Sequence, residues 1–156
     1  MEEIERKFLV DAPPPLIEGR PSTRILQGYL AITDDTEVRL RSRGDDRLLT
    51  AKGGRGMVRR EVTVPLTAEQ FDEMWPLTDG RRVTKRRWVV PHGDVEFEID
   101  VFEGHLEGLI IVEVEFPTAE ASTAFSPPDW CGPEVTHDER YRNAALATEG
   151  MPDPPH

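Results

Sequence analysis

The sequence has little cysteine, no long apolar run and no excess of basic residues. Its single cysteine excludes an internal disulfide and a zinc site made of thiolates. No apolar stretch is long enough to cross a bilayer and no signal-peptide pattern is present, so we expect a cytoplasmic protein with no membrane partner. A net charge of −11 and a pI near 4.8 argue against a nucleic-acid partner, because such surfaces are normally basic. The four histidines lack ligand spacing, which disfavours a histidine metal site.

The remaining composition fits one charge-rich globular domain. The 156 residues are 37% hydrophobic and 31% charged, which suffices for a single core. We expect one domain over residues 1–148 and a disordered, proline-rich tail over residues 149–156. A homodimer that uses part of the apolar sheet face is compatible with this organisation.

Alternating residues and turn signals predict a mainly β (α+β) fold with eight strands. The expected strands cover residues 1–10, 25–32, 37–43, 48–52, 57–64, 81–90, 95–102 and 109–116. A capping box at Thr67 predicts a helix that ends near Pro76. Two further helices are expected, a short one over residues 118–125 and a longer one over residues 138–148.

Charged side chains recur on one face of the expected strands. In the first strand, Glu3, Glu5 and Lys7 alternate with apolar positions. The same alternation places further charged or polar side chains on that face, namely Arg39, Arg41, Thr50, Lys52, Arg59, Glu61, Lys85, Arg87, Glu96, Glu98, Asp100, Glu113 and Glu115. The opposite face is rich in valine, isoleucine and phenylalanine, so other elements such as the helices must pack against it.

Eight strands joined by short turns predict an eight-stranded antiparallel β-barrel, or tunnel, with about three flanking helices. With the helices packed outside, the charged face lines the lumen. An outward ladder of cross-strand salt bridges is the alternative, and alternation alone does not exclude it. A wet lumen with both signs of charge suits a metal–polyphosphate complex, because arginine and lysine bind phosphate oxygens and clustered glutamates bind Mg²⁺.

The ordered motifs resemble those of the CYTH domain, a family also called the triphosphate tunnel metalloenzymes. The resemblance spans about residues 3–147. It rests on Glu3-x-Glu5-x-Lys7, Gln27-Gly-Tyr-Leu30, Glu37-Val-Arg-Leu-Arg41, Thr50-Ala-Lys-Gly53, Arg59-x-Glu61, Lys85-Arg-Arg-Trp88, Glu98-Ile-Asp100-Val-Phe102, Gly108-Leu109, Glu113-Val-Glu115-Phe116 and the segment from Glu134 to Ala147. One departure is Thr63, where many relatives carry another acid.

The resemblance implies a tunnel that hydrolyses or cyclises triphosphates with Mg²⁺ or Mn²⁺. It implies metal ligands at Glu3, Glu5, Glu113 and Glu115, with Asp100 nearby. Triphosphate would be held by Lys7, Arg39, Arg41, Lys52 and Arg87, with Lys85 and Arg59 as helpers. The residues expected to act in catalysis are Glu5, Lys7 and Lys85.

Five further positions have supporting or open roles under the same resemblance. Glu61 would orient basic side chains or join a second metal site, and Glu98 would have a supporting role. Tyr29 would line one mouth or simply pack. Arg140, or else Arg142, would close over the ligand, with a surface salt bridge as an equal alternative.

These expectations lead to a metal-dependent triphosphatase that converts inorganic tripolyphosphate to pyrophosphate and phosphate. No serine, cysteine or histidine is placed as a nucleophile, so attack by a metal-activated water is the expected chemistry. Tripolyphosphate is preferred because no aromatic or amide cluster dedicated to a base or thiazole is evident. The alternatives are a thiamine or nucleoside triphosphatase, a class IV-type adenylate cyclase, and a non-catalytic module that binds polyphosphate.

Overall fold

A computed structural model describes residues 4–54 and 60–155 of the chain. It contains eight strands in one antiparallel sheet, as the alternation predicted. Their bounds are β1 Ile4–Leu9, β2 Thr23–Ile32, β3 Thr36–Arg43, β4 Asp46–Gly53, β5 Arg60–Pro65, β6 Arg82–His92, β7 Val95–Phe102 and β8 Ile110–Phe116. The expected start of the fifth strand, residues 57–59, lies outside the described residues.

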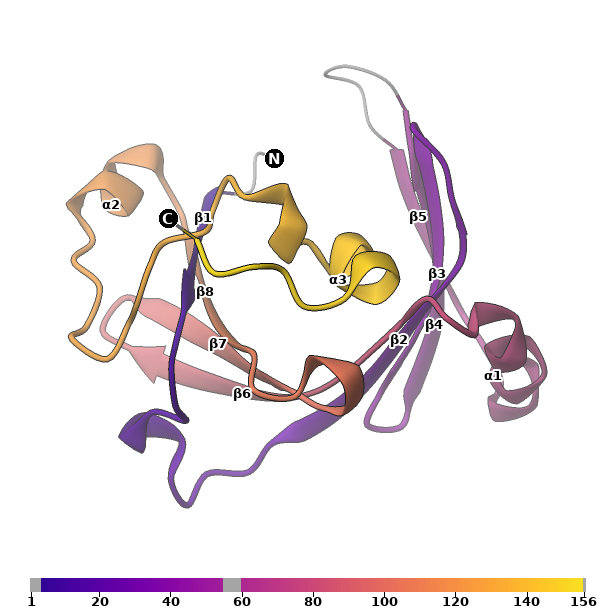
Figure 1. The fold of residues 1–156 in the computed structure, drawn as a ribbon, viewed down its shortest axis with the longest axis horizontal. Coiled ribbons are helices and arrows are strands. Elements are labelled where there is room, and N and C mark those ends of the chain that lie inside the picture. The colour runs from indigo at the N-terminus through magenta and orange to yellow at the C-terminus, as the bar shows by residue number, and fades with distance from the viewer. Residues whose placement is uncertain (1–3, 55–59, 156) are drawn as a thin grey trace.

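The sheet curves into a deep trough (Figure 1). The strand order is β1-β8-β7-β6-β2-β3-β4-β5, so β1 and β5 are the two edges. The eight antiparallel strands confirm the predicted tunnel fold, although no ladder joins β1 to β5 within the described ranges. Residues 132–135 instead run along the outer edge of β1, where Leu9 donates to Pro133 O at 2.9 Å and Val135 donates to Lys7 O at 2.8 Å. This segment protects an edge that would otherwise expose unpaired backbone groups.

Two of the three α-helices lie on the convex side of the trough (Figure 1). Helix α1 (Ala68–Met74) begins with the predicted capping box at Thr67 and is followed by a 3₁₀ turn over Trp75–Thr78. That turn packs against Gly28, where a Cβ atom would lie 2.6 Å from Thr78 Oγ1. Glycine at this position therefore permits close contact between the turn and β2.

Helix α2 (Ala119–Ala124) covers the apolar face of β1, β7 and β8. The buried cluster beneath it includes Phe8, Phe97 and Phe116, and Phe125 and Trp130 pack against this cluster. The ring of Trp130 meets Phe97 edge-on at 5.7 Å between centroids. Trp130 thus packs against this cluster, and the convex face of these strands carries the larger part of the hydrophobic core.

Helix α3 (Asn143–Glu149) lies inside the trough, which corrects the expectation that all helices pack outside (Figure 1). One end of the concave face is apolar, and there Val83, Phe102 and Ile111 form a buried cluster with Leu146 of α3. The expected longer helix over residues 138–148 is divided. A 3₁₀ turn over Glu139–Tyr141 precedes Arg142, whose extended backbone (ψ 144°) separates that turn from α3.

Two further 3₁₀ turns complete the described elements, over Pro15–Ile17 and Gly104–Leu106. Within residues 4–54 and 60–155, no helix has both the length and the apolar composition needed to cross a membrane.

Candidate functional site

Strands β1, β8 and β7 form one wall of the trough (Figure 1). Its concave side carries several carboxylates. Glu5 lies directly opposite Glu115 across the β1–β8 ladder, and Glu98 lies opposite Glu113 across the β7–β8 ladder. Lys7, opposite Glu113, adds one cation to this wall. Like charges that face each other in a ladder are destabilising. The acidic wall (Glu5, Glu98, Glu113, Glu115) therefore favours a positively charged ligand.

The facing wall is basic and is formed by β3 and β4. Arg39 and Arg41 of β3 and Lys52 of β4 share the concave face and line the same cavity. The Nε atom of Arg41 donates to Gln27 Oε1 at 2.8 Å, while Arg39 Nε is buried without a hydrogen-bond partner among the described residues. Because buried N–H groups normally have an acceptor, the basic wall (Arg39, Arg41, Lys52) is suited to an anion.

Residues of both walls, with the exception of Glu115, line one cavity of about 420 Å³. Its lining is almost entirely polar and of both signs: Glu5, Glu37, Glu61, Glu98 and Glu113, with Lys7, Arg39, Arg41, Lys52, Arg87 and Arg142. Tyr29 contributes to the floor, and Thr136, Asn143 and Ala144 contribute from the C-terminal segment. The size is within the usual range for a small-molecule site. The cavity can therefore hold a small, highly charged ligand.

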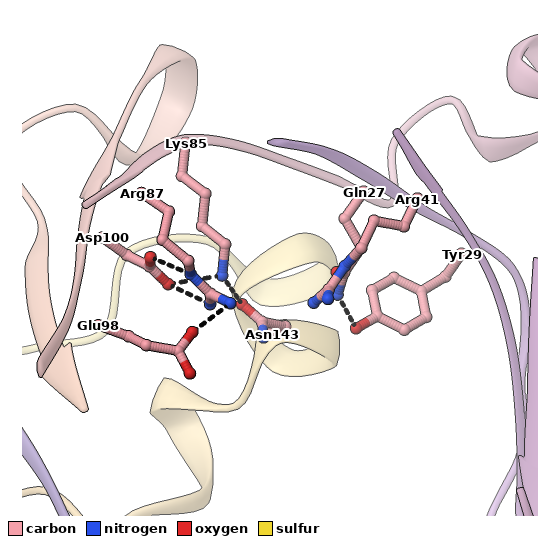
Figure 2. A network of polar contacts seen from close by, with 8 residues as sticks. All are labelled: Gln27, Tyr29, Arg41, Lys85, Arg87, Glu98, Asp100 and Asn143. Atoms are coloured by element: carbon pink, nitrogen blue, oxygen red, sulfur yellow. Dashed lines mark hydrogen bonds and ion pairs between the residues drawn. The ribbon is translucent and has the colours of Figure 1, made fainter. Parts of the chain in front are cut away.

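A buried ion network lies under the floor of this cavity (Figure 2). The carboxylate of Asp100 accepts two hydrogen bonds from Arg87, from Nε at 2.7 Å and from Nη2 at 2.9 Å. Lys85 Nζ lies 2.8 Å from the same carboxylate and donates to Asn143 Oδ1 at 3.3 Å. Arg87 also pairs with Glu98 through Nη1. These contacts fix the guanidinium of Arg87 at the cavity floor.

Burial and neighbouring charges shift the pKa values of these groups. Burial alone would raise the pKa of Asp100, but Lys85 and Arg87 outweigh it and hold the pKa at about 2. Burial lowers the pKa of Lys85, an effect that the Asp100 carboxylate opposes. Burial, together with the charges of Arg39 and Arg87, lowers the pKa of Arg41 to about 10. Arg41 thus remains charged at neutral pH in an environment that favours an added anion.

Most of the predicted site residues meet in this cavity. The lining contains Glu5, Lys7, Tyr29, Arg39, Arg41, Lys52, Glu61, Arg87, Glu98 and Glu113. Glu3 and Arg59 lie outside the described residues. Thr63, the unusual position of β5, shares a hydrogen bond of 2.9 Å with the hydroxyl of Thr50.

Four predicted residues are not found in the cavity lining. Lys85 and Asp100 face each other beneath the floor, 1% and 5% exposed respectively, because α3 covers them. Glu115 is exposed and lies beyond the lining, near the end of β8. Arg140 pairs with Asp138 at 2.7 Å on the surface, so Arg142 rather than Arg140 reaches the cavity.

Several residues of this site were not predicted. Gln27 is fully buried between Arg41 and Tyr29, and Glu37 lines the cavity. The alternation of β3 could have identified Glu37, since it shares the face of Arg39 and Arg41. Thr136 and Asn143 belong to the C-terminal segment, which has no strand alternation, so no local sequence pattern predicts that they line the cavity.

The donor set of the acidic wall fits a hard divalent cation. No group of three or more histidine, cysteine, aspartate or glutamate side chains is gathered as a metal site within the described ranges. Mg²⁺, however, usually takes one or two carboxylates and completes its six oxygen ligands with water and substrate phosphates. Burial raises the pKa of Glu98, with Arg87 opposing and Glu113 adding to the rise. A cation between Glu98 and Glu113 would relieve this repulsion.

Comparisons with known proteins agree with this geometry. A family model described as the CYTH domain matches residues 1–126. A protein of Nitrosomonas europaea named inorganic triphosphatase is 47% identical over 151 residues, which cover 94% of this chain and 97% of that protein. Another of the same name, from Acetivibrio thermocellus, is 36% identical and is covered over 92% of its length. A crystal structure of an inorganic triphosphatase superposes with a TM-score of 0.80 at 44% identity and 95% coverage of both chains.

Proposed function

The chain belongs to the CYTH domain family, and on this premise we propose that it is a divalent-metal-dependent triphosphatase. Its proposed reaction is the hydrolysis of inorganic tripolyphosphate to pyrophosphate and phosphate. The observation that carries the proposal is the single cavity between a carboxylate wall and a basic wall. A highly charged anion that binds together with a metal cation would fit this cavity, with the cation at the acidic wall and the anion at the basic wall.

The basic wall would hold the phosphate chain. The Nε of Arg41 is bonded to Gln27, which leaves its terminal nitrogens available, and Arg39 Nε has no partner among the residues that the structure describes. Lys7 and Lys52 reach the same cavity from β1 and β4. Positive side chains around the bridging and terminal oxygens stabilise the charge that moves onto the leaving pyrophosphate.

The acidic wall would hold the cation, with Glu5, Glu98 and Glu113 as the proposed ligands and Glu3 as a fourth candidate. A bound Mg²⁺ or Mn²⁺ would offset the charge of the phosphate oxygens and supply Lewis acidity. Lys85 and Asp100, beneath the floor, are proposed to orient Arg87 rather than to touch the ligand. The carboxylate of Asp100 already accepts from both cations, so we assign it no metal contact.

Inorganic tripolyphosphate is preferred over organic triphosphates because the described lining offers little to bind a base or thiazole. Tyr29 is the one aromatic side chain in it, and Ala144 the one aliphatic side chain. Triphosphatases for nucleotides or thiamine, a cyclase and a non-catalytic binding module remain the rival activities.

A substrate panel tests this proposal. Purified protein is incubated with tripolyphosphate, ATP or thiamine triphosphate, with Mg²⁺, Mn²⁺ or EDTA. We expect equal amounts of phosphate and pyrophosphate from tripolyphosphate with metal, at least about tenfold slower turnover of the other two, and none with EDTA. Cyclic AMP as the main product from ATP would contradict the hydrolase assignment. Tight binding of tripolyphosphate without phosphate release would favour the binding module.

Replacing Arg41 by alanine tests the basic wall. The variant should lower kcat/KM for tripolyphosphate by about 10- to 100-fold, since one charged hydrogen-bond donor to phosphate is lost. The matched control is Arg86→Ala. This substitution removes the same charge from an exposed position on the convex face of β6. Steady-state kinetics of both variants at one ionic strength provide the measurement. Equal losses in the two variants would indicate a general charge effect and would contradict the assignment of Arg41.

A further inference from the structure

Gln27 is a fully buried polar side chain in the floor of the trough. Its Oε1 accepts a hydrogen bond from Arg41 Nε at 2.8 Å, and its Nε2 donates to Tyr29 Oη at 2.8 Å (Figure 2). Both contacts are short, and both partners line the cavity. Gln27 is therefore placed to control how these two side chains meet a ligand.

The chemistry of arginine fixes the direction of this chain of hydrogen bonds. Arginine donates and cannot accept, so the amide of Gln27 must turn its oxygen toward Arg41 and its nitrogen toward Tyr29. The Tyr29 oxygen then accepts from Gln27. Arg39, which also acts on this hydroxyl, is only a donor, whereas the Glu37 carboxylate acts on it through its charge alone. The hydroxyl hydrogen of Tyr29 therefore needs an acceptor elsewhere.

No such acceptor is provided for Tyr29 by the described protein groups. Gln27 Nε2 donates to its oxygen at 2.8 Å, and the Arg39 guanidinium also acts on that oxygen as a donor. The residue is 1% exposed, but it lines the cavity beside Arg39 and Arg41. The cavity, whose lining also includes Glu37, is where an added acceptor can reach this hydroxyl.

We propose that Gln27 is a positioning residue that turns the Tyr29 hydroxyl into a donor toward a phosphate oxygen of the bound tripolyphosphate. The inference rests on the proposed function and extends it, because it assigns an uncharged donor to a site otherwise made of charges. Gln27 acts through Arg41 and Tyr29 and does not touch the ligand. It also holds the Arg41 guanidinium, so that the terminal nitrogens of Arg41 and the Tyr29 hydroxyl are both directed toward the bound tripolyphosphate.

The protonation state of Tyr29 agrees with a donor role. Burial raises the pKa of Tyr29 above its usual value, although Gln27 and the charge of Arg39 oppose the rise. The phenol is therefore protonated at neutral pH. A bound anion that accepts from the hydroxyl would raise this pKa further, because it favours the protonated form.

A double-mutant cycle tests the coupling between the two residues. Tyr29→Phe should weaken the binding of tripolyphosphate, measured by calorimetry with EDTA, by about 10-fold. In a Gln27→Leu background the same change should cost less than about 2-fold, because the hydroxyl is no longer oriented. Gln70→Leu, which removes a glutamine from the α1 capping box, should lower the melting temperature without changing this affinity. Full additivity of the Tyr29 and Gln27 effects would overturn the inference.

Tyrosine labelled with ¹³C at Cζ gives a readout that a merely structural role would not move. The chain has two tyrosines, so the spectrum has two signals, and Tyr141→Phe assigns them. Saturating tripolyphosphate with EDTA should shift the Tyr29 signal and move its titration to higher pH, and Gln27→Leu should abolish that shift. Binding that leaves the Tyr29 signal unmoved would overturn this inference alone. Absence of any binding or reaction heat by calorimetry, both with EDTA and with Mg²⁺, would overturn the proposed function and this inference with it.

Discussion

Asp100→Asn is expected to lower the free energy of unfolding by about 3–5 kcal/mol, because it leaves two buried cations without their shared counter-ion. Lys85 is 1% exposed, and Arg87 is 8% exposed. Both lie within 2.9 Å of the Asp100 carboxylate. Urea unfolding followed by tryptophan fluorescence measures the loss, and the melting temperature should fall by about 6–20 °C.

The control for this change is Asp94→Asn, an exposed aspartate in the turn between β6 and β7. It removes the same charge without a buried partner and should change stability by less than about 0.5 kcal/mol. In a Lys85→Met background, Asp100→Asn should cost at least about 1 kcal/mol less, since one of the two cations is gone. An equal cost in both backgrounds would show that the Asp100–Lys85 ion pair does not contribute to stability.

The same network predicts an acid-labile contribution to stability. The folded pKa of Asp100 is about 2, below the ordinary value of 3.8. A depressed carboxylate pKa means that the stabilisation is fully present above pH 4 and disappears as the pH falls through 2. Wild type should therefore lose about 2–3 kcal/mol over this window through this group, and Asp100→Asn should not. A stability difference between the two proteins that stays constant from pH 5 to pH 2.5 would contradict the assignment.

Strand alternation predicted much of this fold because the charges themselves repeat with a period of two. In β3, Arg39 and Arg41 share a face, and the partners Thr50 and Lys52 on β4 follow from the same rule. The alternation did not predict that α3 enters the trough. The concave face is apolar at one end, and Val83 and Phe102 have the same alternation as the charged residues of their strands. Only long-range packing decides which part of that face is covered.

Position along a strand limited the prediction of the site in the same way. Lys85 and Arg87 alternate alike on β6, yet Arg87 lines the cavity while Lys85 lies under α3, bonded to Asn143. Glu113 and Glu115 alternate alike on β8, but Glu115 lies beyond the cavity lining. Alternation identifies the sheet face on which a side chain lies, but it does not predict whether that side chain lines the cavity, lies beneath its floor or lies beyond its end. Depth depends on strand curvature and on the C-terminal segment, whose path depends on the extended backbone at Arg142.

Glu5→Gln should reduce metal-dependent hydrolysis of tripolyphosphate by at least about 100-fold, since loss of even a supporting group around a metal costs 10- to 100-fold. Glutamine keeps the shape of the side chain and removes the charge that a divalent cation needs. Glu5 lies on the edge strand β1, at an exposed position of the acidic wall, so the fold should survive the change.

The matched control for Glu5→Gln is Glu96→Gln. Glu96 lies on the same face of the sheet, but it is exposed near the start of β7, outside the cavity lining. Both variants lose one negative charge, so a rate loss confined to Glu5→Gln separates metal binding from a change in the overall field. Raising the Mg²⁺ concentration should recover part of the rate of Glu5→Gln, because weakened metal affinity is compensated by mass action. A wild-type rate and an unchanged Mg²⁺ dependence in Glu5→Gln would show that Glu5 is not a metal ligand. The cation would then have to bind through Glu98 and Glu113, the two carboxylates that face each other across β7 and β8.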